Sequence, residues 1–462
     1  MRILSTFACL LCTSFMALAQ QSAKVYYVPL VDGMEVSANP VKEHVPSGVE
    51  EENPTKIKLY PNLKHQVIEG IGGCFNEIGG EALLSLDKEQ QQEVMNALFN
   101  PETGSGFDMC RMSIGSSDFG IDAYSFSEVA DDYKMKKFSL KREKEYMLPF
   151  IKQAVAINGD LRIFGSPWSP PAWMKGSGEM DNGKENEATN YLIDDEKIYE
   201  AYALYFAKYV EGYKKEGVDI ERICIQNEQD LSVKYPSCRM PVEQMSKFVQ
   251  NYMKPLFTEK KIDTEIWGGT FRTARELEGQ KFVADPELHK DFDGIGIQYT
   301  LPKYLTELKI LNPEMKIMHT EGNCHDGGNT VNQARTRLEE IANYINAGSE
   351  NFCYWNMILN ETGLSGWDWR QNALINIDRE AKTVTYNPDY AVMALISRFI
   401  RPNSTRISSF SFATMITVEK DGAYYVILQN NSENTKQYTC DIEGEFVNFE
   451  LPGLSLCAIE IK

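Results

Sequence analysis

Eight short apolar runs recur along the middle of the chain, and most are separated by segments with the three- and four-residue spacing of amphipathic helices. Runs of this length that alternate with helices predict parallel strands, because each crossover between parallel strands needs a long connection. Eight such units predict an α/β fold, the closed (β/α)8 TIM barrel. The runs cover residues 66–75, 107–115, 161–168, 220–228, 264–271, 292–300, 316–323 and 351–359.

The segments between the runs carry helix signals of their own. Residues 195–217 have apolar and aromatic side chains at helical spacing and stop at Gly217. Residues 330–348 also stop at a glycine. In residues 84–99, Ser85 with Glu89 nearby indicates a helix start.

The two ends of the chain do not follow this alternation. They are strand-like and turn-rich, and Asp421-Gly422 is a hairpin signal between two apolar runs. We therefore predict a β-sandwich built from both termini, residues 20–60 and 404–462, attached to a catalytic barrel over 61–403.

Residues 1–19 have the pattern of a targeting segment. They contain one Arg, an apolar core and Ala17-Leu18-Ala19 before Gln20. This predicts a secretory signal peptide that is cleaved after Ala19. The core is too short for a spanning helix, so we expect a secreted or periplasmic protein with no stable membrane insertion.

The charge balance narrows the class of partner. The chain has 66 acidic and 47 basic residues, a net charge of −19, which argues against nucleic acid and anionic membrane surfaces. The balance is compatible with a neutral substrate such as a sugar. The eight cysteines beyond the signal peptide form no CxxC pair and the histidines are scattered, so no metal site is expected. Buried free thiols are favoured, although an oxidising compartment leaves disulfides open.

Two glutamates stand at matching places in this pattern. Glu228 ends the fourth run and Glu321 ends the seventh, at the carboxyl ends where barrel enzymes gather their active residues. Two carboxylates that face each other across a barrel mouth suit cleavage of a glycosidic bond. Asn227 can hold a sugar 2-hydroxyl, which makes Glu228 the proton donor with a raised pKa. Glu321 is then the ionised nucleophile, with Arg111 of the second run as its partner.

The tryptophans agree with a sugar site. Flat indole rings stack on the C–H faces of sugars, and the indole N–H can donate to hydroxyl groups. All six lie within or just after the third, fifth or eighth run: Trp168, Trp173, Trp267, Trp355, Trp367 and Trp369.

Seven motifs now carry a resemblance to a known family: "GIGGCF", "RMSIGSSDFG", "SPWSPPAWMK", "QNEQD…KYPSC", "HTEGN", "YWNMIL" and "LISRFIRPNSTRI". In this order they resemble glycoside hydrolase family 30, which includes glucosylceramidases, endo-β-1,6-glucanases, β-xylosidases and β-fucosidases. The resemblance covers about residues 66–410. It implies a (β/α)8 barrel with a β-sandwich from both chain ends, a retaining mechanism and no cofactor.

The resemblance also implies roles for single residues. It makes Glu228 the acid/base and Glu321 the nucleophile. The residues it implies in substrate binding are Asp118 and Trp168 at the non-reducing sugar, Asn227 beside the acid/base, Trp355 near the reacting sugar and Asn372 at a subsite.

Some positions depart from the family pattern. Gln229 replaces the proline that often follows the acid/base, and the first motif reads "CFNE" in place of a Thr-Asp form. The sixth run ends in Gln298-Tyr299-Thr300 where His-Trp-Tyr is common. The aromatic hydroxyl near the nucleophile would fall at Thr300, so Tyr299 supplies it or it is lost. The fifth run carries "WGGTFRTAR" in place of an Asp-containing stretch.

The leading hypothesis is an exported retaining β-glycoside hydrolase that cleaves β-linked glycans or glycoconjugates by double displacement. By resemblance it is glucosylceramidase-like or β-1,6-glucanase-like. One alternative is an exo-enzyme of the β-xylosidase or β-fucosidase type, and another is a non-catalytic glycan-binding protein on a hydrolase scaffold. A partner of lipid membranes, as glucosylceramide cleavage would imply, is disfavoured by the acidic composition.

Overall fold

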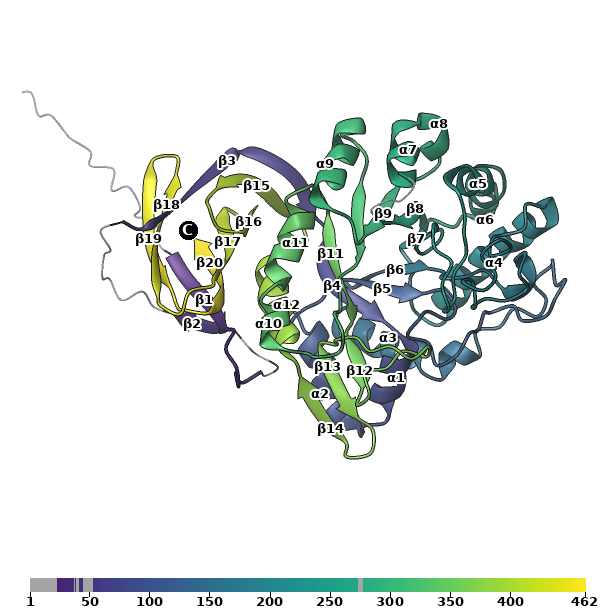
Figure 1. Cartoon of the computed structure of the whole chain (residues 1–462), viewed down its shortest axis with the longest axis horizontal. Coiled ribbons are helices and arrows are strands. Elements are labelled where there is room, and N and C mark those ends of the chain that lie inside the picture. The colour runs from purple at the N-terminus through teal and green to yellow at the C-terminus, as the bar shows by residue number, and fades with distance from the viewer. Residues whose placement is uncertain (1–22, 37, 39–40, 45–52, 273–276) are drawn as a thin grey trace, which may run out of the picture.

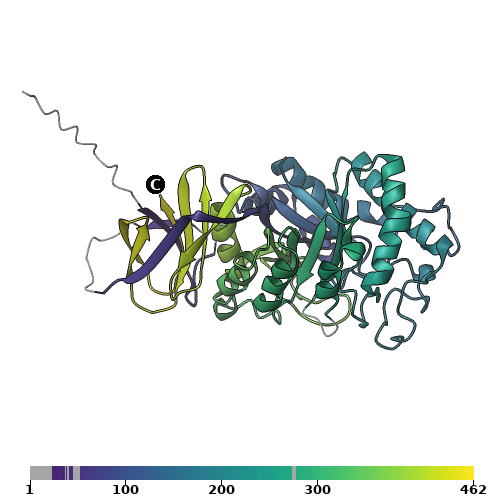
Figure 2. The same ribbon diagram turned by 90° about the horizontal axis from the view of Figure 1, so that it is seen from above.

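The computed structural model describes residues 23–462 apart from 37, 39–40, 45–52 and 273–276. Figure 1 and Figure 2 show a barrel surrounded by helices and, beside it, a strand-rich part that contains both ends of the described chain. The predicted signal peptide, residues 1–19, lies outside the described residues.

The barrel consists of eight parallel strands in the order β10-β9-β8-β7-β6-β5-β4-β11. The seam between β10 and β11 is joined by hydrogen bonds from the Gly322 N–H to the Cys353 carbonyl (2.8 Å) and from the Glu350 N–H to the Ile317 carbonyl (3.0 Å). Each strand falls within one predicted run, so the (β/α)8 prediction is confirmed. The strands are β4 (Gly70–Phe75), β5 (Met109–Ser113), β6 (Arg162–Ser166), β7 (Arg222–Cys224), β8 (Glu265–Phe271), β9 (Gly294–Gln298), β10 (Ile317–Glu321) and β11 (Asn351–Asn356).

Helices connect and cover these strands (Figure 1). They are α1 (Glu77–Leu84), α2 (Lys88–Phe99), α3 (Met147–Ile157), α4 (Glu196–Lys215), α5 (Val242–Phe248), α6 (Lys254–Lys260), α7 (Glu278–Ala284), α8 (Pro286–His289), α9 (Pro302–Leu311), α10 (Val331–Ala334), α11 (Arg337–Ile345) and α12 (Pro388–Phe399). Short 3-10 turns occupy Arg142–Lys144 and Ala172–Met174, and a π-helical turn spans Val249–Met253.

Helix α4 shows why the segment 195–217 is helical. Its N-cap Asp195 accepts a hydrogen bond from the Lys197 N–H at 2.9 Å. Just past the helix, Gly217 adopts a φ of 83°, which glycine reaches without strain. The buried face follows helical spacing and carries a stripe of fully buried tyrosines: Tyr199, Tyr202, Tyr205, Tyr209 and Tyr213.

The predicted helix start near Ser85 is wrong. Ser85 is the C-cap of α1, and α2 begins with a capping box between Asp87 and Gln90. A carboxylate at the N-cap paired with an amide three residues later satisfies two free N–H groups at once, which a start at Ser85 cannot do.

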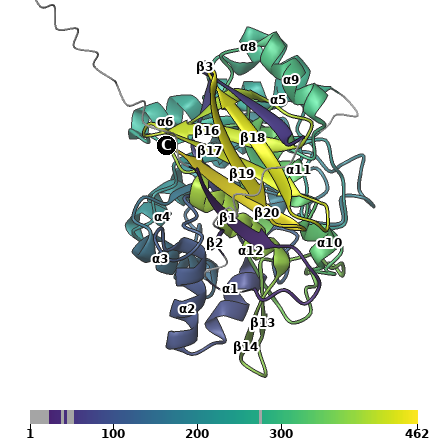
Figure 3. The same cartoon turned by 90° about the vertical axis from the view of Figure 1, so that its left-hand side faces the viewer.

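The second part is a nine-stranded sheet in the order β19-β18-β3-β15-β16-β17-β20-β1-β2. It curls so that β19 contacts β1 (Figure 3). The sheet combines strands from both ends of the chain, as predicted. The strands are β1 (Ala23–Pro29), β2 (Lys42–His44), β3 (Thr55–Ile68), β15 (Ser404–Phe410), β16 (Met415–Lys420), β17 (Ala423–Asn430), β18 (Lys436–Ile442), β19 (Glu445–Leu451) and β20 (Ser455–Ile461).

Strand alternation divides the side chains of this sheet between two cores. Val426 and Leu428 of β17 point into the core inside the curled sheet, whereas Ile427 belongs to the core shared with the barrel. Helix α12 contacts β1, β20 and β4, so it lies between the two parts. The Asp421-Gly422 hairpin prediction is confirmed, since both residues have positive φ between β16 and β17.

Strand β3 links the two parts. It pairs with β15 as far as Ile68, opposite Ser404, and β4 of the barrel begins two residues later at Gly70. A small third sheet of β12 (Ile358–Asn360), β13 (Ile375–Asp378) and β14 (Thr383–Tyr386) follows the last barrel strand.

Two further properties bear on the sequence predictions. All eight cysteines within the described residues are free and buried. Over the same part of the chain, the structure contains no helix with the length and apolar character needed to span a membrane.

Candidate active site

Arg111 lies at the centre of a hydrogen-bond network in the mouth of the barrel. Arg111 lies on β5, two residues before its carboxyl end, and its side chain is fully buried. Nη1 donates to Glu321 Oε2 at 2.8 Å, and Nη2 donates to Asn227 Oδ1 at 2.7 Å and to Ser166 Oγ at 2.6 Å. The predicted pairing of Arg111 with Glu321 is therefore present.

Glu321 is the last residue of β10 and receives donors on both carboxylate oxygens. Besides Arg111, the Tyr299 hydroxyl donates to Oε1 at 2.8 Å and Gln298 Nε2 donates to Oε2 at 3.3 Å. Charge-assisted hydrogen bonds of this kind stabilise the carboxylate form.

Glu228 follows β7 in a backbone conformation that its neighbours enforce. Its φ is 42°, in the left-handed region where a residue with a Cβ costs about 1 kcal/mol or more. The Glu228 N–H donates to Thr270 Oγ1 at 3.1 Å, and the Asn227 N–H donates to the Pro167 carbonyl at 2.8 Å. These hydrogen bonds join the segment after β7 to β8 on one side and to the residue after β6 on the other, which directs Glu228 into the mouth.

The two carboxyl groups have different electrostatic surroundings. Burial and then the charge of Glu321 raise the pKa of Glu228 to about 7. Burial also raises the pKa of Glu321, but Arg111 and the Tyr299 hydroxyl oppose that rise. Glu228 is accordingly the group that retains a proton near neutral pH, and Glu321 the group that is better stabilised as an anion.

Three more predicted residues lie around this pair. The rings of Trp168 and Trp355 stack with centroids 5.2 Å apart, and the Arg111 guanidinium lies 4.5 Å from the Trp168 ring. The charges of Glu321 and Glu228 both act on Asp118, whose pKa is raised well above its usual value, first by burial and then by those charges. Asp118 Oδ1 and Trp355 Nε1 are buried and find no hydrogen-bond partner among the described residues. Buried polar atoms of this kind in a mouth are suited to substrate hydroxyls.

The predicted aromatic hydroxyl comes from Tyr299, not from Thr300. Tyr299 has a φ of 48°, which turns its ring toward Glu321, whereas the Thr300 hydroxyl donates to the Gln298 carbonyl at 3.1 Å. The exchange of His-Trp-Tyr for Gln-Tyr-Thr therefore keeps the hydroxyl and moves it by one residue.

Sequence reasoning missed Gln298 as part of the network. Its side chain is fully buried, accepts from Arg111 and from Thr320 Oγ1 (2.7 Å), and donates to Asn227 Oδ1 (3.3 Å). Its side chain also lowers the pKa of Glu228. The signal was its place at the end of the sixth run, beside Tyr299.

Tyr235 and Arg272 were also missed, although both belong to motifs that stand out in the sequence. The Tyr235 hydroxyl approaches Glu228 Oε2 at 3.5 Å, and Arg272 Nε lies 3.6 Å from Glu228 Oε1. They come from "KYPSC" and "WGGTFRTAR".

Two expectations need correction. Asn372 is fully buried, and its side-chain oxygen accepts from the N–H groups of Gly327 (3.0 Å) and Asn329 (3.1 Å). It holds the loop after β10, which leaves its oxygen no capacity for a sugar. Trp267 lies near the amino end of β8, where Nε1 donates to Glu265 at 2.8 Å and Arg222 covers the ring at 4.6 Å. It belongs to the far end of the barrel and not to a sugar site.

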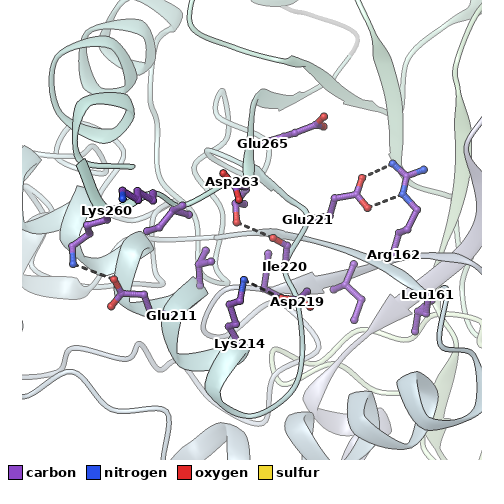
Figure 4. A pocket seen from close by; sticks show the side chains of 15 residues that line it. Leu161, Arg162, Glu211, Lys214, Asp219, Ile220, Glu221, Lys260, Asp263 and Glu265 are labelled. Atoms are coloured by element: carbon purple, nitrogen blue, oxygen red, sulfur yellow. Dashed lines mark hydrogen bonds and ion pairs between the residues drawn. The ribbon is translucent and has the colours of Figure 1, made fainter. Parts of the chain in front are cut away.

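That far end contains a cavity of about 620 Å³, shown in Figure 4. It lies between the amino ends of β6 to β8 and the carboxyl ends of α4 and α6. Several of its charged side chains form ion pairs, among them Lys260 with Glu211 (3.1 Å) and Arg162 with Glu221. Burial alone would raise the pKa of Glu221, but Arg162 lowers it, so Glu221 is held as an anion.

Within the described residues, no group of three or more His, Cys, Asp or Glu side chains is placed to hold a metal ion.

Comparisons with known proteins identify the family of the chain. The model of the glycosyl hydrolase family 30 TIM-barrel domain matches residues 68–400. The lysosomal acid glucosylceramidase of Mus musculus is 24% identical over 432 residues, covering 87% of this chain and 82% of the relative. The endo-1,6-beta-D-glucanase neg1 of Aspergillus fumigatus is 31% identical over 212 residues, which is 44% of this chain and 43% of the relative.

Among solved structures, the endo-beta1,6-glucanase BT3312 has the same fold, with a TM-score of 0.83 and 23% identity over 95% of this chain and 98% of that chain. The family match spans well over half of the chain and includes every barrel strand. The chain belongs to glycosyl hydrolase family 30.

Proposed function

We propose that this protein is an exported retaining β-glycoside hydrolase that acts on β-linked glucosides. The observation that carries the proposal is the pair of buried carboxyl groups at the ends of β7 and β10, one with a pKa of about 7 and one held by Arg111 and Tyr299. Two carboxyl groups with unlike proton affinities are what double displacement requires.

In the first step, Glu321 attacks the anomeric carbon while Glu228 gives its proton to the departing glycosidic oxygen. In the second step, Glu228 takes a proton from water, and the water oxygen displaces Glu321 from the sugar. Asn227, held by Arg111 at 2.7 Å, is oriented to bind the sugar 2-hydroxyl. Asp118, Trp168 and Trp355 surround the reacting sugar.

The names of the relatives supply the substrate classes to be tested, which are glucosylceramide and β-1,6-glucan. We would measure hydrolysis of aryl β-glucoside, β-fucoside, β-galactoside and β-xyloside together with both of these substrates. Release from one aryl glycoside would identify an exo-acting enzyme and its sugar, and would decide between a glucosidase and a β-xylosidase or β-fucosidase. Release from the polymer alone would indicate an endo-acting enzyme.

Glu321→Gln should abolish turnover, and Glu221→Gln at the far end of the barrel serves as the matched control. A 2-deoxy-2-fluoro glycoside of the preferred sugar should leave a covalent mass on Glu321 in the wild type. Turnover by the folded Glu321→Gln variant at the wild-type rate would overturn the proposal. Saccharide binding without hydrolysis of any substrate would favour a glycan-binding protein instead. Export is tested by sequencing the amino terminus of the mature protein, which we expect at Gln20.

A further inference from the structure

Arg272 lies between two carboxylates in the mouth, and the reaction steps above do not use it. Its Nε is 3.6 Å from Glu228 Oε1 and 3.6 Å from Asp230 Oδ1. The Arg272 side chain is 26% exposed, and those of Glu228 and Asp230 are 8% exposed each. Neither Arg272 Nε nor Asp230 Oδ1 has a hydrogen-bond partner in the described part of the chain. The guanidinium is thus close to both carboxylates without a hydrogen bond from Nε to either.

Double displacement moves one negative charge across the mouth. Before the first step the charge is on Glu321, since Glu228 is protonated; afterwards Glu321 is an ester of the sugar and Glu228 is the anion. Arg111 lies against the first position at 2.8 Å, and Arg272 lies against the second at 3.6 Å. Each of the two carboxyl groups that carry the charge therefore has one guanidinium beside it. The closer contact is the one to Glu321, which is the anion before reaction.

We propose that Arg272 is a positioning residue that is shared between Asp230 and Glu228. It moves toward Glu228 when Glu228 releases its proton. This proposal rests on the proposed function. In the free enzyme Asp230 draws part of the cation away, which lets Glu228 keep its proton for the leaving group. In the glycosyl-enzyme the cation pairs with ionised Glu228, which stabilises the base that activates water. No group beyond substrate and water is required.

The electrostatics of the site support this assignment. Burial alone would lower the pKa of Arg272, but Glu228 and then Asp230 outweigh burial and raise it. Among the influences on Glu228, Arg272 lowers its pKa and Asp230 raises it. The other ionisable or charged groups that act on Glu228 or adjoin it are Glu321, Asp118, Tyr235, Tyr299 and Arg111.

The test is the pH dependence of kcat/KM, whose alkaline limb reports the proton on Glu228 in the free enzyme. Arg272→Gln removes a positive charge, so the limb should move to higher pH by about one unit. Asp230→Asn removes a negative charge, so the limb should move to lower pH by a similar amount. Arg272→Lys keeps the charge and should stay near the wild type.

Two controls make these shifts specific. Arg379 is a cation shared by two other carboxylates, Glu81 (2.8 Å) and Glu361 (2.7 Å), and Arg379→Gln should leave the limb unchanged. A dinitrophenyl glycoside has a leaving group that departs without a proton, so its kcat/KM should lack the limb in every variant.

Opposite shifts in Arg272→Gln and Asp230→Asn would support the proposal, since a purely structural loss would lower activity without moving the limb in two directions. Limbs that stay at the wild-type pH, or move the same way, in folded variants would overturn it. Failure of the proposed function gives a different result, because then either no substrate is hydrolysed by the wild type or the folded Glu321→Gln variant still turns over.

Discussion

The two ends of the barrel both hold buried arginines among carboxylates, and they use them differently. At the amino end, Arg222 donates to Glu69 at 2.5 and 2.8 Å and contacts Glu265 at 2.9 Å. Burial alone would raise the pKa of Glu69, but the two bonds from Arg222 outweigh it and lower the pKa. At the mouth, Arg111 bonds Glu321 at 2.8 Å and opposes the rise that burial causes in its pKa, whereas Arg272 lies 3.6 Å from Glu228.

The difference lies in burial and in the number of donors for each carboxylate. At the amino end, Glu69 and Glu221 are partly exposed and receive direct guanidinium bonds, which lower their pKa values and keep them anionic. Glu228 and Asp118 are deeply buried with few donors, so their pKa values rise. The bonds from Arg222 satisfy the carboxylate of Glu69, whereas the mouth leaves Glu228 with few donors.

The largest expected effect separates the two arginines directly. Arg111→Met and Arg222→Met each leave a carboxylate without its buried partner, which should cost about 3–5 kcal/mol of unfolding free energy. Only Arg111→Met should also lower kcat/KM, by about 10²–10³-fold, because Glu321 loses its stabilising donor. Denaturant unfolding and steady-state kinetics measure the two quantities. Equal kcat/KM values in the two folded variants would contradict the contrast between the ends.

Glu228→Gln tests whether the mouth is maintained at a cost in stability. The pKa of Glu228 rises from 4.5 in the unfolded chain to about 7 in the fold. The stability that goes with the bound proton is full below pH 4.5 and is lost as pH rises to about 7, a loss of about 3 kcal/mol. As pH rises from 4.5 to 7, the variant should therefore lose less unfolding free energy than the wild type. At pH 8 the variant should be more stable than the wild type. A constant difference between the two proteins across this range would argue against the raised pKa.

Tyr299→Phe tests the donor that distinguishes Glu321 from Glu228. The lost hydroxyl bonds a carboxylate at 2.8 Å, and such a bond contributes about 1.5–3 kcal/mol. We expect kcat to fall by about ten- to a hundred-fold in initial-rate measurements. Thr300→Val is the matched control, because Thr300 bonds only the backbone of Gln298 in this network. A larger loss in Thr300→Val than in Tyr299→Phe would reverse the assignment of the hydroxyl.

The smallest expected effect compares two fully or nearly fully buried indoles. Trp168→Phe should raise KM by several-fold. The smaller ring loses part of the aromatic surface of the stacked pair in the mouth, which should weaken substrate binding by about 1 kcal/mol. Trp267→Phe should leave KM unchanged and lower stability by a similar amount, because it breaks the bond to Glu265. Substrate titrations and thermal unfolding of both variants make the comparison. A raised KM in Trp267→Phe would place that ring in the sugar site after all.

Much of the fold was predictable because its signals are local. The eight strands fall within eight apolar runs, the Asp421-Gly422 turn has both residues at positive φ, and α4 spans nearly all of the segment expected from its tyrosine spacing. Helix boundaries were less predictable. The N-cap of α2 is Asp87 and not Ser85, since the choice depends on which side chain reaches the free N–H groups.

The site was predictable as far as strand ends determine it. Glu228 follows β7 and Glu321 ends β10, so their meeting at one mouth follows from parallel topology. Trp267 was misplaced because the seven-residue strand β8 crosses the whole barrel, and a position near its start belongs to the opposite end. Asn372 was misplaced because a motif does not reveal whether an amide faces the substrate or its own loop.

By itself, the sequence determined the barrel, its attached terminal sheet and the two glutamates that end the fourth and seventh strands. These features follow from the periodicity of apolar residues and the spacing of the motifs, which can be read along the chain without knowing which distant residues meet. Only the tertiary structure decided which donors each glutamate receives. Gln298 and Tyr299 lie at the end of β9 and Arg272 lies just after β8, and their distances to Glu228 and Glu321 exist only once the barrel closes. Because a pKa depends on distances of a few ångströms, the division between acid and nucleophile is a property of the closed fold.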